Sequence, residues 1–209
     1  MTTENSTENI LGTFSTCKYH FAKKSKSYTK IYWFVKKVDD ETFEVQPLNK
    51  NRVPSGVASY ITKEKFVENY EPEPFYYKNI VVPILVKLDE ALEEGESKHA
   101  EGMFDEAEAA FVEAIKIDDE NVRANLGLGA VYSDMGEEEK VQEVLVRLME
   151  LDGTFQESQR HQLNKFGVSL RKNKMYDKAL TFYQQALEIN ASDENLHFNM
   201  ARVYYAVKK

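Results

Sequence analysis

Residues 102–136 read GMFDEAEAAFVEAIKIDDENVRANLGLGAVYSDMG, a stretch that begins and ends on a glycine. The interval of 34 residues between Gly102 and Gly136 also separates Gly95 from Gly129. A fixed period of this length is typical of repeat proteins. An interval of 34 residues accommodates two antiparallel helices of about four turns each, joined by short loops. The stretch therefore predicts an array of helix pairs.

The period continues toward the C-terminus with one irregularity. Gly129 and Gly167 are 38 residues apart, and Gly167 and Ala201 are again 34 apart. The difference of 4 residues equals about one helical turn, so an added turn keeps the apolar face in register. We expect the first helix of the third repeat to begin a turn early, near Phe155. The alternative is a longer loop.

Side-chain size follows the same period. Small residues recur where paired helices cross closely, and large residues recur where they fill the adjacent hollows, as ridge-into-groove packing requires. The small positions include Ala107, Ala114, Ala179 and Ala186, and the large positions include Phe111, Leu145 and Tyr183. This pattern predicts one continuous core along the array.

The ends of the helices are marked by turn and capping residues. Pro83 can start the first helix, because a proline in the first turn lacks only an amide that would be unpaired there. Asp105 and Asp177 are expected to cap the second helices of the first and third repeats. Gly102 and Gly136 fall in the turns within helix pairs, where the left-handed conformation favours glycine.

The repeated segments resemble the tetratricopeptide repeat (TPR) family. The segments are GMFDEAEAAFVEA, LGAVYSDMG and FGVSLRKNKMYDKALTFYQQA, and the family pattern is L-G-x-x-Y followed by G-x-[FY]-x-x-A-x-x-x-[FY]-x-x-A. The second repeat departs from it where Val141 and Leu148 replace alanines. The resemblance covers residues 84–209 and implies an α-solenoid of helix pairs followed by one further helix.

The same resemblance implies a binding groove. In TPR proteins the first helices line a concave surface that holds an extended peptide or a partner helix. Carried over position by position, it is lined here by Arg123, Leu126, Asn164, Lys165, Val168, Arg171, Phe198, Asn199, Arg202 and Tyr205. The groove runs from an acidic to a basic end, with Phe198 and Tyr205 as aromatic anchors. Some relatives grip a C-terminal carboxylate with lysine and asparagine, but Leu92 and Glu96 replace these residues here, so no such clamp is predicted.

The fourth unit supplies one helix, NLHFNMARVYYAVKK, and no second. The ends of solenoids normally carry a polar cap, whereas this helix carries apolar residues such as Phe198 and Tyr204. The helix could itself act as the cap, the natural chain could continue, or this end could pair with another molecule. Self-assembly through this helix is therefore an alternative function.

The first part of the chain has a different composition. Residues 1–80 have a net charge of +2, and residues 81–209 have a net charge of −10. Alternation of apolar and polar residues predicts strands, and Thr62 can cap a short helix that follows it. The expected strands are 27–39, 42–48 and 57–61, with an earlier one around 14–22, and the expected helix is 63–70. The chain is thus predicted to be α+β, with a flexible N-terminus over 1–13, a small antiparallel β-rich module over 14–80 and the TPR array over 84–209.

A basic and aromatic segment lies within this module. Residues 10–38 contain seven lysines and no acidic residue, and aromatic residues are interleaved with them over 18–37. Such a composition suits single-stranded nucleic acid or an acidic protein partner. The simpler interpretation is that the aromatic rings form the core and the lysines are solvated. A nucleic-acid-associated adaptor is the second hypothesis.

The sequence contains no pattern that predicts catalysis, a cofactor or a metal. Glu96–His99 and Glu194–His197 are E-x-x-H steps, but they lie in the first and fourth repeats, so four helices cannot bring them to one di-iron core. Cys17 is the single cysteine, and it is expected to be an unreactive thiol. We predict a non-enzymatic adaptor whose concave groove binds a peptide or protein segment.

The location is predicted from similar considerations. No apolar run approaches the ~18 residues that a membrane helix needs, and the first dozen residues lack the features of a secretory signal. A single cysteine is consistent with a reducing compartment. We therefore expect no membrane insertion and a cytoplasmic protein.

Overall fold

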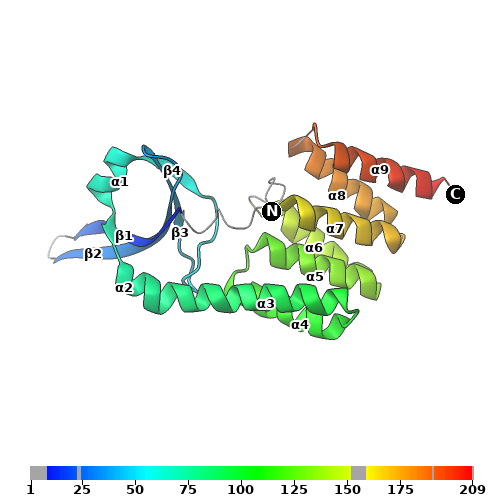
Figure 1. Cartoon of the computed structure of the whole chain (residues 1–209), viewed down its shortest axis with the longest axis horizontal. Helices are drawn as coiled ribbons and strands as arrows, with labels where there is room; N and C mark the ends of the chain where they lie inside the picture. Colours follow the sequence, from blue (N-terminus) through cyan, green and yellow to red (C-terminus); the bar gives the residue numbers. More distant parts are fainter. Residues whose placement is uncertain (1–8, 23–24, 152–158, 190, 209) are drawn as a thin grey trace. The chain divides into compact units, whose positions relative to one another are not determined.

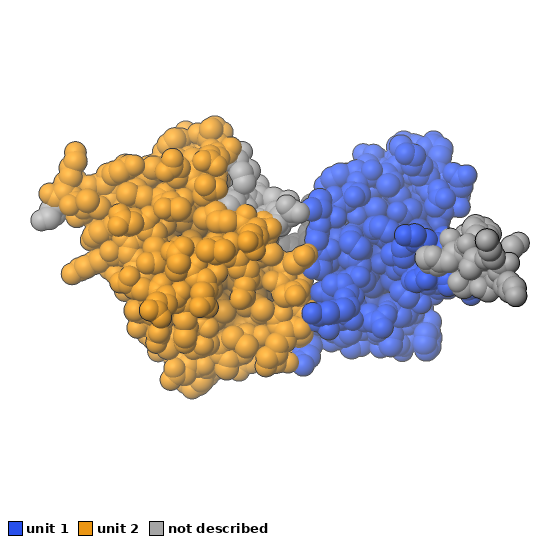
Figure 2. Space-filling view, turned by 180° about the vertical axis from the view of Figure 1, so that it is seen from behind, with its two compact units in different colours: residues 1–87 blue, residues 88–209 orange. Residues whose placement is uncertain are grey.

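The computed structural model describes most of the chain, namely residues 9–22, 25–151, 159–189 and 191–208. The chain divides into two compact units, which Figure 2 shows in blue (residues 1–87) and orange (residues 88–209). The first unit holds an antiparallel sheet and the second consists of successive helices (Figure 1). The predicted α+β class, with a helical solenoid after a β-rich module, is confirmed.

The first unit is built on a five-stranded sheet in the order β4-β3-β2-β1-β5. Its elements are β1 (Ile10–Ala22), β2 (Ser25–Lys37), β3 (Thr42–Pro47), β4 (Ser59–Thr62), α1 (Lys63–Asn69) and β5 (Glu71–Pro72). All neighbouring strands are antiparallel, and β1 pairs with β2 along almost its whole length. The strands predicted over 27–39, 42–48 and 57–61 and the helix predicted over 63–70 are confirmed, with shifts of at most two residues at their ends.

The predicted boundary between the flexible N-terminus (1–13) and the first strand is wrong, because the strand begins earlier. Strand β1 begins at Ile10 and pairs with β2 from there, with a register shift before Gly12. Gly12 has φ +105°, and a Cβ there would lie 3.0 Å from the ring of Tyr77. Such a bulge interrupts the alternation by which a strand is detected in a sequence. Residues 1–8 lie outside the described part of the chain.

The core of the first unit gathers on both faces of β2. On one face Val35, Phe43 and Val45 are buried, and α1 contributes Phe66, whose ring stacks on that of Phe43 with centroids 4.3 Å apart. On the other face Phe34 is also buried, against the ring of Tyr77. The neighbouring residues Phe34 and Val35 are thus buried on opposite faces, so both faces of β2 are covered.

The first helix of the array begins before Pro83, where it was predicted to start. Helix α2 (Pro74–Tyr76), the π-helical turn η1 (Tyr77–Val81) and α3 (Val82–Ala100) follow one another directly. Pro74 occupies the first turn of α2, where a proline fits. Pro83 lies inside the helical run, and a proline ring clashes there with the carbonyl four residues earlier. The wider π-helical turn directly before it relieves that clash.

The second unit continues with helices in pairs. They are α4 (Phe104–Ile117), α5 (Val122–Met135), α6 (Glu138–Glu150), α7 (Arg160–Lys172), α8 (Tyr176–Ile189) and α9 (Glu194–Val207). Gly102 and Gly136 both have φ +78°, which confirms their predicted left-handed turns. The start of the third repeat predicted near Phe155 lies outside the described residues.

The two predicted acidic caps are wrong. Helix α4 begins at Phe104 after the N-cap Met103, so Asp105 lies in its first turn. Helix α8 begins at Tyr176, so Asp177 likewise lies in the first turn. The two aspartates still stabilise these helices through the helix dipole, which favours negative charge in the first turn. Dipole and cap preferences place the same residue types a position or two apart, so sequence alone did not separate them.

The core of the second unit follows the predicted pattern of small and large residues. The small positions Ala107, Ala114, Ala179 and Ala186 and the large positions Phe111, Leu145 and Tyr183 are all buried. A Cβ on Gly95 would lie 2.8 Å from the ring of Phe111, so this glycine lets the two helices approach. The first helices also pack on one another, α5 on α7 and α7 on α9. The side chains that α3, α5, α7 and α9 leave exposed therefore form one row across the array.

Candidate functional site

A cavity of about 310 Å³ opens between α3, α5 and α7, with Phe111 of α4 at its floor. Three successive first helices thus contribute to one hollow, because each packs beside the next. The side chains of α3 and α5 that line it are Glu96, His99, Ala100, Arg123, Leu126, Gly127, Ala130 and Asp134. Those of α7 are Gln162, Lys165, Val168, Ser169 and Lys172.

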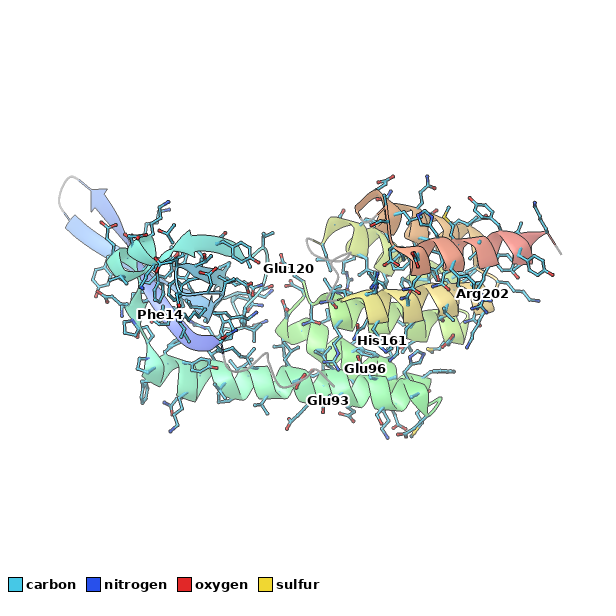
Figure 3. All side chains as sticks on the ribbon, turned by 45° about the horizontal axis from the view of Figure 1, so that its top comes forward. Phe14, Glu93, Glu96, Glu120, His161 and Arg202 are labelled. Atoms are coloured by element: carbon cyan, nitrogen blue, oxygen red, sulfur yellow. The ribbon has the colours of Figure 1, made fainter. Side chains whose placement is uncertain are left out.

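The wall between α3 and α5 is an ion-paired cluster. Arg123 binds Glu96 in a bidentate manner, with Nε–Oε1 2.8 Å and Nη2–Oε2 2.9 Å, and also contacts Asp89 at 3.3 Å. The hydrogen bonds from Arg123 hold the pKa of Glu96 below its usual range, against the opposing effect of burial. Glu96 is labelled on α3 in Figure 3. The charge of Arg123 is therefore already compensated by residues 27 and 34 positions earlier in the chain.

A second polar cluster joins three helices around Asp134. Its carboxylate contacts Nε2 of His99 at 2.8 Å and accepts hydrogen bonds from Ser169 Oγ at 2.6 Å and Asn173 Nδ2 at 2.6 Å. Burial alone would raise the pKa of Asp134, but these three partners outweigh it and lower the pKa. The carboxylate stands between serine and histidine, whereas a nucleophilic triad places histidine in the middle. The cluster ties α3, α5 and the end of α7 together.

Helix α7 presents positive charge to the concave face. Its sequence RHQLNKFGVSLRK contains no acidic residue. Lys165 and Lys172 line the cavity, and Arg171 lies beside Lys172 on the same helix. None of these three forms an ion pair with the described residues. This wall is therefore electropositive, in contrast to the compensated wall between α3 and α5.

Helix α9 continues the row beyond the cavity. Asn199 is buried and donates a hydrogen bond to Asn164 Oδ1 of α7 at 3.0 Å. Phe198 is 62% exposed, and the guanidinium of Arg202 lies 5.6 Å from its ring centroid. Tyr205 is exposed one turn later. These side chains present an aromatic and cationic surface next to α7.

The predicted groove residues thus fall into two sets. The cavity brings together Arg123, Leu126, Lys165 and Val168. The others lie outside its lining, namely Asn164, Arg171, Phe198, Asn199, Arg202 and Tyr205. Whether both sets form one groove for a partner stays a prediction.

Sequence reasoning missed several lining residues. Asp134, Gln162 and Ser169 line the cavity, although none was predicted as a groove residue. Asp134 could have been found from helical spacing, since it follows Ala130, another lining residue, by one turn of α5. Its bonds to His99 and Ser169 depend on side-chain geometry and leave no signal in the sequence.

Part of the basic and aromatic segment of the first unit is engaged within that unit. The Trp33 ring packs against the core, and its Nε1 donates to Thr16 Oγ1 at 3.0 Å. Lys30, Lys36 and Lys37 pair with Glu73, Glu44 and Asp40 respectively. These contacts favour the interpretation of a packed core with compensated lysines over a surface for nucleic acid.

The described residues contain no group of three or more His, Cys, Asp or Glu side chains arranged to hold a metal ion. Among the helices in the described part of the chain, none has both the length and the apolar character needed to span a membrane.

Helix pairs with a period of 34 residues, glycines at the crossings and first helices packed side by side define the second unit as an α-solenoid. Two family models match it, one described as TPR repeat over residues 167–207 and one described as tetratricopeptide repeat over residues 98–161. The second unit of the chain belongs to the tetratricopeptide repeat family. The predicted resemblance is confirmed.

Solved structures with a similar fold include TPR domains from distant proteins. The second TPR domain of human RPAP3, in complex with the HSP70 peptide SGPTIEEVD, is 13% identical and has a TM-score of 0.44, covering 58% of this chain and 98% of that chain. The Sgt2 TPR domain from Aspergillus fumigatus is 17% identical with a TM-score of 0.46, covering 58% and 79%. The pilF protein of Pseudomonas aeruginosa is 20% identical with a TM-score of 0.48, covering 61% and 56%. A comparison with curated proteins gave no match.

Proposed function

We propose that this protein is a non-enzymatic adaptor whose TPR array binds an extended peptide or protein segment on its concave face. The observation that carries the proposal is the cavity of about 310 Å³ formed jointly by α3, α5 and α7. It combines apolar side chains such as Leu126 and Val168 with polar groups at its rim, a combination typical of binding sites. The first unit supplies a second contact or positions the array. The cytoplasmic location expected from the sequence stays a prediction.

Site-specific photo-cross-linking tests this function. A photoreactive phenylalanine analogue replaces Val168 in the cavity, and in a control variant it replaces Lys116, an exposed residue in the last turn of α4. After irradiation in an extract of the source cells, the Val168 variant should cross-link one segment of a partner, and the Lys116 variant should not. Cross-links from Lys116 alone, or partner capture without any cross-link from Val168, would contradict binding in the cavity.

Self-association through α9 is a second candidate. Four large apolar side chains of this helix are more than half exposed, namely Phe198, Tyr204, Tyr205 and Val207. Light scattering at increasing protein concentration tests it. A mass that rises with concentration, and does so less in a Tyr204→Ser variant, would support self-association, whereas a constant monomer mass would rule it out.

A further inference from the structure

A buried hydroxyl without a partner lies between α7 and α8. Tyr183 of α8 is completely buried, and its ring passes so close to Gly167 of α7 that no Cβ would fit there. Its Oη has no hydrogen-bond partner among the described residues. Burial of an unpaired hydroxyl destabilises a fold, and phenylalanine would fill the same space without that penalty. The hydroxyl therefore calls for an explanation other than packing.

The charges of two arginines act on this hydroxyl. Arg171 follows Gly167 by one turn on α7, and its Nε is also buried without a partner in the described part of the chain. Arg202, labelled in Figure 3, lies on α9. Burial raises the pKa of Tyr183 to about 12, and the charges of Arg171 and Arg202 both act to lower it. The Tyr183 hydroxyl and the Arg171 Nε–H are thus two buried donors that have no partner among the described residues.

The surrounding charge has the same sign. Lys165 and Lys172 stand on the same helix as Arg171, and none of these residues or Arg202 forms an ion pair with the described residues. Lys165 acts electrostatically on Glu96, but this carboxylate is already bonded to Arg123. Four uncompensated cations over two adjacent helices exceed what one terminal carboxylate needs. They match a segment that carries several acidic side chains.

We propose that the surface formed by Lys165, Arg171, Lys172 and Arg202, with the Tyr183 hydroxyl at its floor, binds carboxylate side chains of an extended acidic segment. This acidic-segment site rests on the proposed function and specifies the chemistry of its ligand. One carboxylate accepts hydrogen bonds from the two guanidinium groups, which suit planar anions. The neighbouring exposed ring of Phe198 offers contact to an apolar residue of the same segment.

Fluorescence polarisation with synthetic peptides and the full chain tests the site. The probe is a fluorescein-labelled, C-terminally amidated peptide of about twelve residues in which Asp and Glu alternate with Leu and Ile. Its matched partner carries Asn and Gln in place of the acids. At low ionic strength the acidic probe should bind at least about tenfold more tightly than the amide probe, since charge-assisted bonds are lost in the latter.

Variants locate the binding. Arg171→Gln and Arg202→Gln should each weaken binding of the acidic probe by about tenfold, whereas Lys116→Gln on α4 should leave it unchanged. Tyr183→Phe should weaken binding by about threefold or more without lowering the melting temperature. Tyr204→Phe, at an exposed position of α9, is the matched control.

Each contrary result has a distinct meaning. If neither probe binds, or if both bind equally, the acidic ligand class is wrong. The cross-linking from Val168 then still tests separately whether a partner binds in the cavity. If Arg171→Gln and Arg202→Gln bind like the wild type, the site is wrong and the adaptor function stands. Tight binding only of a probe with a free C-terminus would assign a terminal carboxylate instead and overturn the acidic segment. A Tyr183→Phe variant that melts at a lower temperature would show a structural role for the hydroxyl.

Discussion

Lys174 stands at the position that glycine occupies in the other two turns. It follows Gly136 by the same 38 residues that separate Gly129 from Gly167. Its φ of +62° is left-handed, like the +78° of Gly102 and Gly136. A side chain with a Cβ is strained in this conformation. The third turn is therefore the least favourable of the three.

Lys174→Gly should stabilise the protein by about 0.5–1 kcal/mol, because relief of the left-handed strain exceeds the entropy that glycine loses on folding. Chemical denaturation of the variant and the wild type measures the change. Gly136→Lys provides the reverse test and should destabilise by a similar amount. A Lys174→Gly variant that is less stable than the wild type would refute this account of the turn.

Asp134 should make stability depend on acidity. Its pKa is lowered in the folded protein, so its stabilising effect is complete above the unfolded pKa of about 3.9. The effect is lost as the pH falls through the lower folded value. Asp134→Asn should therefore be less stable than the wild type by about 1–2 kcal/mol at neutral pH, with the difference shrinking below about pH 4.

Thermal melts of both proteins between neutral pH and about pH 3 measure this difference. Glu143→Gln is a control, because that glutamate is exposed in the middle of α6. A constant gap between Asp134→Asn and the wild type across this range would show that the carboxylate charge does not stabilise the cluster.

At the scale of the helix, α4 and α5 differ in how their N-termini are stabilised. A side chain caps α5, whereas the predicted cap of α4 lies in the first turn instead. Asn121 caps α5 and accepts a hydrogen bond from the backbone N–H of Ala124 at 2.9 Å. Asn121→Ala should cost about 1 kcal/mol. Asp105→Ala should cost less, about 0.3–1 kcal/mol, because Asp105 acts only on the helix dipole. Denaturant midpoints of the two variants give the comparison, and a larger loss for Asp105→Ala would restore it as the cap of α4.

The helices of the array were predictable because their pattern repeats. The interval of 34 residues predicted the helix pairs, and the recurrence of small and large residues predicted which side chains form their core. The start of the first helix was not predictable, because Pro83 reads as a helix start and its accommodation depends on the π-helical turn before it. The start of β1 was missed for a similar reason, since Gly12 hides the strand pattern.

The concave face was predictable only in part. Position in the repeat identified Arg123, Leu126, Lys165 and Val168 as neighbours of one hollow. It did not reveal that Arg123 is compensated by Glu96 while α7 carries uncompensated cations, since these pairings join residues 27 positions apart through their side-chain conformations. The number of charged residues in the sequence therefore did not reveal which charges on the concave face are compensated by an ion pair and which are not.

At the scale of the whole molecule, the ion pairs of lysines in the first unit argue against nucleic-acid binding by that unit. Lys30, Lys36 and Lys37 are bonded to acidic residues, and the partly buried Trp33 ring packs against the core. We therefore expect a full-chain variant with Lys30→Gln, Lys36→Gln and Lys37→Gln to bind a fluorescein-labelled single-stranded oligonucleotide at low salt as the wild type does, because the charges of these lysines are already compensated. Polarisation titrations of both proteins measure this. Weaker binding by the variant would revive the nucleic-acid hypothesis.

The close approach of glycines and aromatic rings has a consequence for how this protein can change over time. The ring of Tyr183 fits only because Gly167 lacks a Cβ. The ring of Phe111 likewise fits only because Gly95 and Gly127 lack a Cβ. A larger residue at one of these glycines is tolerated only if the facing ring shrinks at the same time. In related sequences each glycine should therefore covary with its ring as an inherited pair, and a repeat copied into another array must be moved together with the neighbour that completes the pair.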